Sequence, residues 1–269
     1  SRRVTAKHSR QSSNEPRQPE IISQNFNKPG MPMADELCPS SIPVITIDGP
    51  SGSGKGVVAT HLATLYNYHL LDSGALYRLV GISARNAGVD LDASQLDEAR
   101  LAAIALALEV VFEATGDPEN PLRITLSGED VTTRVRTNDA GVGASIVAAI
   151  PGVRAGLLSL QASFRQPPGL IADGRDMGTV VFPDADVKIF LTASAEARAK
   201  RRYNQLKDKD IGVSLHALFQ SIQARDERDT NRAVSPLKPA EDAFVIDSTD
   251  MDINDVLKSV QAVVKEKLG

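Results

Sequence analysis

A glycine-rich stretch near residue 50 carries residue types that bind phosphate groups. It reads, in order, Gly49, Pro50, Ser51, Gly52, Ser53, Gly54 and Lys55. The glycines allow backbone N–H groups to turn toward a polyphosphate, and the lysine can reach its β- and γ-phosphates. An apolar, β-branched run at 44–47 precedes the stretch, and a helix-capable run at 57–63 follows it. A flexible turn without a ligand is the alternative, but the order of strand, glycine loop and helix predicts a phosphate loop that binds a nucleoside triphosphate.

The position after the lysine departs from the usual pattern of such loops. Gly56 stands where a Ser or Thr usually ligates magnesium, and Val57 offers no hydroxyl either. We therefore expect Mg²⁺ to be bound together with the nucleotide, mostly through phosphates and water, which suits a small and strongly hydrated cation. Ser51 and Ser53 stay open as hydroxyl ligands. The four histidines show no ligand spacing, so no metal site built from protein side chains is predicted.

Arginines recur outside the loop, at the ends of strand-like runs or in the helices that follow them. They are Arg78, Arg154, Arg175, Arg201, Arg202, Arg225, Arg228 and Arg232. The last three are spaced i, i+3 and i+7, so they share one face if the helix persists that far. Phosphoryl transfer to a nucleotide brings two anionic phosphates together, and planar guanidinium groups suit that task. The alternative is a solvated helix face, because acids at 226, 227 and 229 alternate with these arginines.

Two acids flank Arg175 in the segment 173–178. Asp173 ends an apolar run, which fits the acid that stands behind magnesium in nucleoside-triphosphate sites. An acceptor that is already an anionic phosphate needs no general base. We therefore interpret Asp176 as a residue that recognises a base or ribose, with a turn or cap residue as the alternative.

The elements that must position these residues alternate along the chain. Strand-like runs lie at 44–47, 70–72, 170–173, 187–191 and 244–247. Helix-prone runs lie at 57–63, 95–108, 138–164 with a break near Pro151, from Ser214 onward, and 253–267, and Ser214 is predicted to cap the helix that it begins. This alternation predicts an α/β fold with a doubly wound, mostly parallel sheet flanked by helices. Two further strand-like runs, 108–113 and 122–126, are separated by turn residues and predict a small sheet of their own.

Charge and composition restrict the class of partner. The 269 residues carry a net charge of −4. Residues 1–30 hold six basic and two acidic residues, so the rest has 24 basic and 32 acidic residues, a net charge of −8. Such a body is a poor partner for nucleic acid. No apolar run approaches the length of a bilayer span, so no membrane partner is expected.

The first forty residues and the cysteine content suggest where the protein works. Cys38 is the only cysteine, which excludes an internal disulfide and fits a reducing cytosol. We therefore expect a cytoplasmic location. Residues 1–41 are rich in polar residues and proline and are predicted to be a disordered extension. An organelle transit peptide is the weaker alternative, because acids and prolines interrupt the Arg- and Ser-rich start.

Four segments of the chain resemble the bacterial cytidylate kinases, which phosphorylate CMP and dCMP with ATP. The segments are 45–52 (ITIDGPSG), 70–78 (LLDSGALYR), 171–183 (IADGRDMGTVVFP) and 225–233 (RDERDTNRA). The resemblance runs from about residue 42 to the C-terminus. It implies a P-loop kinase fold in a domain of residues 42–269, with an insert at about 85–165 on the monophosphate side and a short lid at about 195–212. We also expect a monomer.

The resemblance further implies roles for individual residues. The ATP site would be formed by the phosphate loop with Gly56 and Val57, closed by Arg201 and Arg202 in the lid. The CMP site would be formed by Ser73, Arg78, Ser145, Arg154, Arg175, Asp176, Arg225, Asp229 and Arg232. Within these sets Lys55, Arg175 and Arg232 would be the catalytic residues. Val57 stands where the family often has Thr, which leaves the role of that hydroxyl open.

Two alternatives remain beside this hypothesis. Another small-molecule P-loop kinase, acting on UMP, AMP, shikimate or dephospho-coenzyme A, would share the loop but differ in its acceptor site. A non-catalytic module that senses ATP would have no need of a second phosphate site, so the arginines outside the loop count against it.

Overall fold

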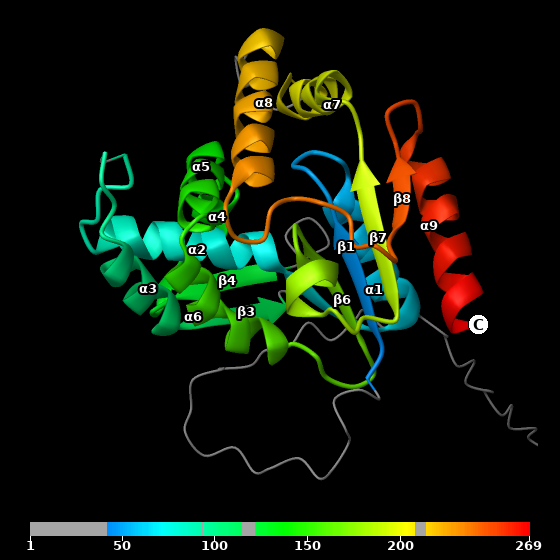
Figure 1. Cartoon of the computed structure of the whole chain (residues 1–269), viewed down its shortest axis with the longest axis horizontal. Coiled ribbons are helices and arrows are strands. Elements are labelled where there is room, and N and C mark those ends of the chain that lie inside the picture. Colours follow the sequence, from blue (N-terminus) through cyan, green and yellow to red (C-terminus); the bar gives the residue numbers. More distant parts are fainter. Residues whose placement is uncertain (1–41, 93, 115–121, 208–213) are drawn as a thin grey trace, which may run out of the picture.

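The computed structural model describes residues 42–92, 94–114, 122–207 and 214–269 (Figure 1). The expected extension at 1–41, with Cys38, lies outside the described residues, and so does the second part of the expected lid.

The main sheet consists of five parallel strands in the order β2-β6-β1-β7-β8. They are β1 (Val44–Asp48), β2 (His69–Asp72), β6 (Leu170–Gly174), β7 (Val187–Thr192) and β8 (Phe244–Asp247). The central strand β1 is buried on both faces, as its continuous apolar run indicates. The predicted mostly parallel sheet is confirmed, and every expected main-sheet strand is present.

Helices cover both faces of this sheet. Helices α1 (Lys55–Tyr66) and α9 (Ile253–Leu268) lie on one face, where Val58, Leu62 and Val260 pack against Ile45 and Ile47. Helix α2 (Ser73–Asn86), α6 (Pro151–Ala162) and the short π-helix η2 (Met177–Val181) lie on the other. Because side chains alternate along a strand, Thr46 and Asp48 point toward η2 while Ile45 and Ile47 point toward α1.

A second unit stands beside the main sheet (Figure 1). Its antiparallel sheet has the order β3-β4-β5, and its hydrophobic core is continuous with that of α2 and β6. The elements are α3 (Glu98–Leu106), β3 (Val110–Ala114), β4 (Leu122–Leu126), β5 (Glu129–Asp130), α4 (Thr132–Val135) and α5 (Asn138–Val147), followed by α6. The small separate sheet and the break at Pro151, which begins α6, are confirmed.

The bend between α5 and α6 bears on whether these two apolar helices could span a membrane. In the described part of the chain, no single helix is long and apolar enough to cross a membrane. The two helices reach that length and composition only when taken together across a 106° bend.

Two helices stand above the carboxyl ends of the main sheet (Figure 1). Helix α7 (Ala195–Lys207) follows β7, and α8 (Leu215–Asn231) packs against it. The predicted cap is confirmed, because the Ser214 hydroxyl accepts a hydrogen bond from the Ala217 N–H at 3.0 Å. The helix ends at Asn231, so Arg232 is its C-terminal cap residue rather than a member of its last turn.

Candidate active site

The phosphate loop, residues 49–55, leaves the carboxyl end of β1 between its neighbours β6 and β7. Gly49 has φ +147°, and a Cβ there would lie 2.0 Å from the Leu191 carbonyl oxygen on β7. Only glycine permits this approach. Gly54, with φ +99°, caps the start of α1 and leaves the first N–H groups of that helix facing the loop. The loop therefore has the backbone form that binds polyphosphate.

Lys55 begins α1 and is buried under its own loop. Its Nζ donates a hydrogen bond to the Pro50 carbonyl at 2.9 Å and lies 4.0 Å from an Asp173 carboxylate oxygen. Burial, together with the charge of Arg175, lowers the pKa of Lys55 to about 8 against the effect of Asp173. Burial also raises the pKa of Asp173 to about 6. An incoming polyphosphate would favour the charged lysine.

The residues around Lys55 fit magnesium only as an ion carried with the nucleotide. Gly56 supplies no hydroxyl, and a Cβ there would lie 3.7 Å from Asp173 Oδ2. Ser53 Oγ is buried and has no hydrogen-bond partner among the described residues. No group of three or more His, Cys, Asp or Glu within those residues is placed to hold a metal. One carboxylate and one hydroxyl suit a cation that keeps phosphate and water ligands.

A second charged group adjoins the loop, and we call Arg78, Arg175, Arg225 and Arg232 the arginine cradle. Helices α2 and α8 and the end of β6 bring these residues together from distant parts of the sequence. Ser73, Arg175, Asp176, Arg225, Asp229 and Arg232 line one pocket. Arg225 Nη1 lies 3.3 Å from Ser51 Oγ, which places the cradle directly beside the phosphate loop.

Three guanidinium N–H donors of the cradle are buried without a hydrogen-bond partner among the described residues. They are Arg78 Nε, Arg225 Nε and Arg232 Nη2. Burial lowers the pKa of Arg225 to about 10, and the neighbouring Arg175 lowers it too. A buried donor without a partner costs about 1–3 kcal/mol. An anion bound in the cradle would satisfy these donors and offset the repulsion among the arginines.

Asp229 is the acid that holds the cradle together. Arg175 Nε donates to its Oδ2 at 3.0 Å, and Arg225 Nε lies 4.0 Å from the same oxygen. The Ser145 hydroxyl donates to its other oxygen at 3.2 Å. Burial alone would raise the pKa of Asp229, but Arg175 and Arg225 outweigh it, so the pKa lies below its usual range.

Asp176 and Arg154 form a buried ion pair at the far end of the pocket. Their side chains are 2% and 8% exposed, respectively, and the Arg154 guanidinium lies 5.6 Å from the centre of the Tyr77 ring. Arg232 Nη2 lies 4.0 Å from the other carboxylate oxygen of Asp176. Ser73, nearby, donates to Gln161 Oε1 at 2.9 Å. Charged donors and acceptors beside an aromatic ring can hydrogen-bond a heterocyclic base.

The expected lid arginines do not line the pocket, but both lie close to the site. Arg201 donates to the hydroxyl and carbonyl of Ser248, and that hydroxyl lies 3.5 Å from the Ser53 carbonyl of the phosphate loop. Arg202 Nη1 reaches Gln205 at 3.5 Å, and burial, together with the charges of Arg175 and Arg202, lowers the pKa of Arg78 in the cradle. Arg228, expected on the same face as Arg225, is exposed, and its Nε contacts Ser145 Oγ at 3.3 Å. The structure thus brings together the loop and the predicted CMP residues, with the two lid arginines near them but outside the pocket.

Sequence reasoning overlooked two residues at this edge of the sheet. Arg198 is buried, donates to the Ser51 carbonyl at 3.1 Å and pairs with Asp226, so it ties α7 and α8 to the loop. Asp48 is buried at the end of β1 and accepts hydrogen bonds from the start of η2. The available sequence signal for Asp48 was its position as an acid directly before the phosphate loop. No sequence signal identified the partner of Arg198.

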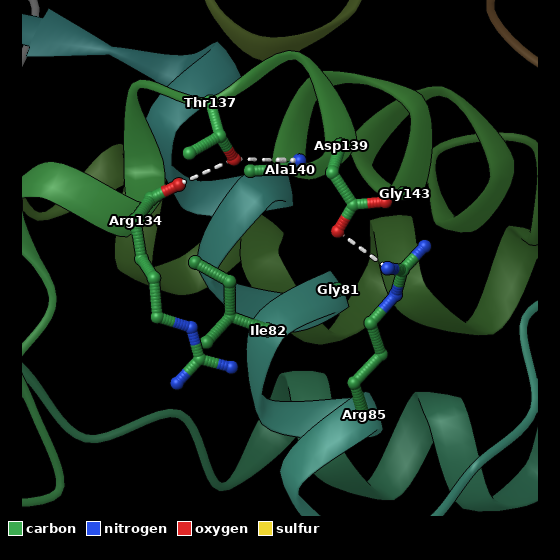
Figure 2. Close-up of a pocket in the computed structure, with 8 residues that line it drawn as sticks. All are labelled: Gly81, Ile82, Arg85, Arg134, Thr137, Asp139, Ala140 and Gly143. Carbon is green, nitrogen blue, oxygen red and sulfur yellow. Dashed lines mark hydrogen bonds and ion pairs between the residues drawn. The ribbon is translucent and has the colours of Figure 1, made fainter.

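A separate cavity of about 210 Å³ is lined by residues of α2, α4 and α5, among them Arg85, Arg134 and Asp139 (Figure 2). It also contains two arginines, but Arg85 pairs with Asp139, and Arg134 bonds to Asn86 and lies near Glu129. Its guanidinium groups are therefore neutralised by acids. The unsatisfied cationic donors belong to the arginine cradle.

A phosphate loop at the carboxyl edge of a parallel sheet, next to a second cationic pocket, defines a P-loop kinase. A family model described as cytidylate kinase matches residues 45–266. The chain is 57% identical over 228 residues to a cytidylate kinase of Pseudomonas putida (strain W619), with 85% of this chain and 98% of that protein covered. It is 53% identical over 231 residues to a cytidylate kinase of Aeromonas hydrophila, with coverages of 86% and 97%. The chain belongs to the cytidylate kinase family.

Proposed function

We propose that this protein transfers the γ-phosphoryl group of ATP to CMP or dCMP, giving ADP and CDP or dCDP. The observation that carries the proposal is the pair of adjoining anion sites, joined by the 3.3 Å contact between Arg225 and Ser51. Family membership supports the same reaction. A sensor of ATP would need only the first site, and nothing in the second favours AMP, UMP or shikimate as the acceptor.

In this account the phosphate loop and Lys55 bind the ATP phosphates, while the arginine cradle and Ser73 bind the phosphate of CMP. Arg175 and Arg232, beside the transferred group, would stabilise charge as it spreads over the equatorial oxygens. Bound Mg²⁺ would neutralise charge on the β- and γ-phosphates, and Asp173 and Ser53 are the residues placed to assist it. No general base is required, because the accepting oxygen is already anionic.

Base recognition is assigned to the buried pair of Asp176 and Arg154, with Ser145 at the edge of the pocket. A carboxylate can accept from the cytosine N4 amine, whereas UMP presents a carbonyl oxygen at that position. Arg225 and Asp229 would contact the sugar. The pocket measures about 40 Å³, well below the roughly 300 Å³ of ordinary ligand sites. We therefore expect α5 and α8 to move apart to admit the monophosphate, before the insert closes over it.

The lid and insert belong to the same proposal. Residues 195–212 would close over ATP and bring Arg201 and Arg202 toward its phosphates, and the insert at about 85–165 would close over CMP. Closure would exclude water, which otherwise competes as the phosphoryl acceptor. We also propose a monomer that works in the cytoplasm, with nucleotides rather than nucleic acid as partners.

A coupled ADP-release assay with ATP and Mg²⁺ tests the reaction across CMP, dCMP, UMP, AMP and shikimate. We expect the largest kcat/KM with CMP or dCMP. A larger value with AMP or shikimate, or no acceptor-dependent ADP release at all, would refute the assignment.

A further inference from the structure

Asp48 occupies a position shared by the two anion sites. It is the last residue of β1, directly before Gly49 of the phosphate loop, and its side chain is 5% exposed. The strand alternation points it away from α1 and toward η2, which begins directly after Asp176. Asp48 is therefore joined to the start of the phosphate loop through its backbone. Its side chain contacts Met177 and Gly178, which directly follow the proposed base reader Asp176.

Both carboxylate oxygens of Asp48 are used. Oδ1 accepts from the Met177 N–H at 2.9 Å, and Oδ2 accepts from the Gly178 N–H at 2.8 Å. The residue at the N-cap position of η2, Asp176, makes no capping bond with its own side chain. Asp48, on β1, therefore supplies the cap of η2. The Asp176 carboxylate is left free to pair with Arg154.

Burying a carboxylate at this position has a desolvation cost. Burial, with smaller contributions from Asp176 and Asp173, raises the pKa of Asp48 to about 7 in spite of the two N–H donors. A neutral amide would avoid part of this cost but would offer an acceptor to only one of the two N–H groups. Only a carboxylate offers two equivalent acceptor oxygens to two successive N–H groups.

We propose that Asp48 is a positioning residue that sets the place of Asp176 relative to the phosphate loop. The inference rests on the proposed function, because Asp176 reads the base in that account. Asp48 itself has no substrate contact there. Its effect reaches the base through Met177, the residue directly after Asp176.

The first test is Asp48→Asn, assayed with CMP and with UMP. We expect the preference for CMP over UMP in kcat/KM to fall about tenfold, as when one base-reading contact is misplaced. The KM for ATP should stay within about twofold. A loss of equal size for CMP and UMP would overturn the proposal, because a merely structural role lowers both alike.

Asp186→Asn is the matched control. Asp186 Oδ2 accepts a hydrogen bond from the Val44 N–H at 2.8 Å, so it holds the opposite end of the same strand. We expect this variant to leave the ratio of CMP to UMP activity unchanged. A change as large as that in Asp48→Asn would mean that any disturbance of β1 alters selectivity, and would overturn the proposal.

A double-mutant cycle with Asp176→Ala separates positioning from a direct effect. If Asp48 acts through Asp176, Asp48→Asn should not change the CMP-to-UMP ratio further in the Asp176→Ala background. An undiminished effect there would contradict the inference. If Asp48→Asn does not fold, Asp48→Ser, which keeps one acceptor oxygen, takes its place in the cycle.

Hydrogen exchange provides a readout that does not depend on the acceptor. In Asp48→Asn the amides of residues 177–181 should exchange faster than in the wild type, while those of α9 should not change. Unchanged exchange at 177–181 would overturn the proposal, whatever the activity of the variant with CMP. If the wild type fails to phosphorylate CMP, the proposed function is wrong, and the exchange result still decides whether Asp48 holds this segment.

Discussion

The phosphate loop and the arginine cradle both bind phosphate in this account, but they are built in opposite ways. The loop consists of seven consecutive residues, 49–55, whose main-chain amides and one lysine provide the positive charge. The cradle collects side chains from residue 78 to residue 232, held by acids such as Asp229. The loop is fixed by local backbone conformation, and the cradle by tertiary packing.

The difference suggests which site can adapt. The loop has little freedom, because Gly49 lies against the backbone of Leu191. The cradle collects residues from α2, from α8 and from the end of β6, and three of its donors have no hydrogen-bond partner among the described residues. We infer that the donor site is largely preformed, whereas the acceptor site forms fully only around its ligand.

The largest expected effect comes from removing the single cation of the loop. Lys55→Ala should lower kcat about 10²- to 10³-fold, because the charge that develops on the transferring group loses a buried cation. CMP binding without ATP should be unaffected. Lys258→Ala, an exposed lysine on α9, is the control. Steady-state kinetics with a Tm measurement would check this, and turnover near that of the wild type would remove Lys55 from the mechanism.

A smaller effect is expected from removing one of the four cradle arginines. Arg78→Ala should lower kcat/KM for CMP about 10- to 100-fold, since charge-assisted hydrogen bonds contribute about 1.5–3 kcal/mol. The affinity for ATP should not change. The control is Arg85→Ala, which lies two turns further along α2 and pairs with Asp139 in the separate cavity (Figure 2). Equal losses in both variants would contradict the assignment of the cradle.

Base selectivity should respond to Asp176 more than ATP affinity does. In Asp176→Ala we expect the CMP preference over UMP to fall about tenfold. The protein should also lose stability of about 3 kcal/mol, because Arg154 stays buried without its partner. The CMP preference is the ratio of the activities with CMP and with UMP, so it does not depend on the fraction of the protein that is folded. Asp184→Ala, which breaks an ion pair with Arg165 at the surface, is the control. An unchanged ratio would remove Asp176 from base reading.

The smallest effect concerns pH. The pKa of Lys55 is lowered to about 8 in the free protein, and ATP should raise it again because the phosphates favour the ammonium form. ATP binding should therefore take up a proton above pH 8, and its affinity should fall by up to about tenfold per pH unit there. Calorimetry in two buffers of different ionisation enthalpy measures this uptake. Binding without proton uptake at pH 9 would show that Lys55 is already charged.

The comparison also explains what the sequence could predict. The loop and the parallel strands follow from local order, since glycines, a lysine and β-branched runs act over a few residues. The helix cap at Ser214 and the break at Pro151 were predictable for the same reason. The cradle was predicted only in part, as a set of arginines beside strands, and the role of each came from family resemblance.

Tertiary partners account for what the sequence did not reveal. The contact of Arg198 with Ser51 spans 147 positions, and that of Asp48 with Gly178 spans 130. No short-range pattern encodes such a pairing. The same limit applies to the contact of Arg201 with Ser248, which spans 47 positions.

Calorimetric binding of each substrate alone to Lys55→Ala and Arg78→Ala tests the two-site account most directly. We predict that Lys55→Ala binds CMP like the wild type but binds ATP weakly, and that Arg78→Ala shows the reverse. If either substitution weakened both ligands alike, or if CMP bound only when the lysine was present, the claim of two separable phosphate sites would be contradicted.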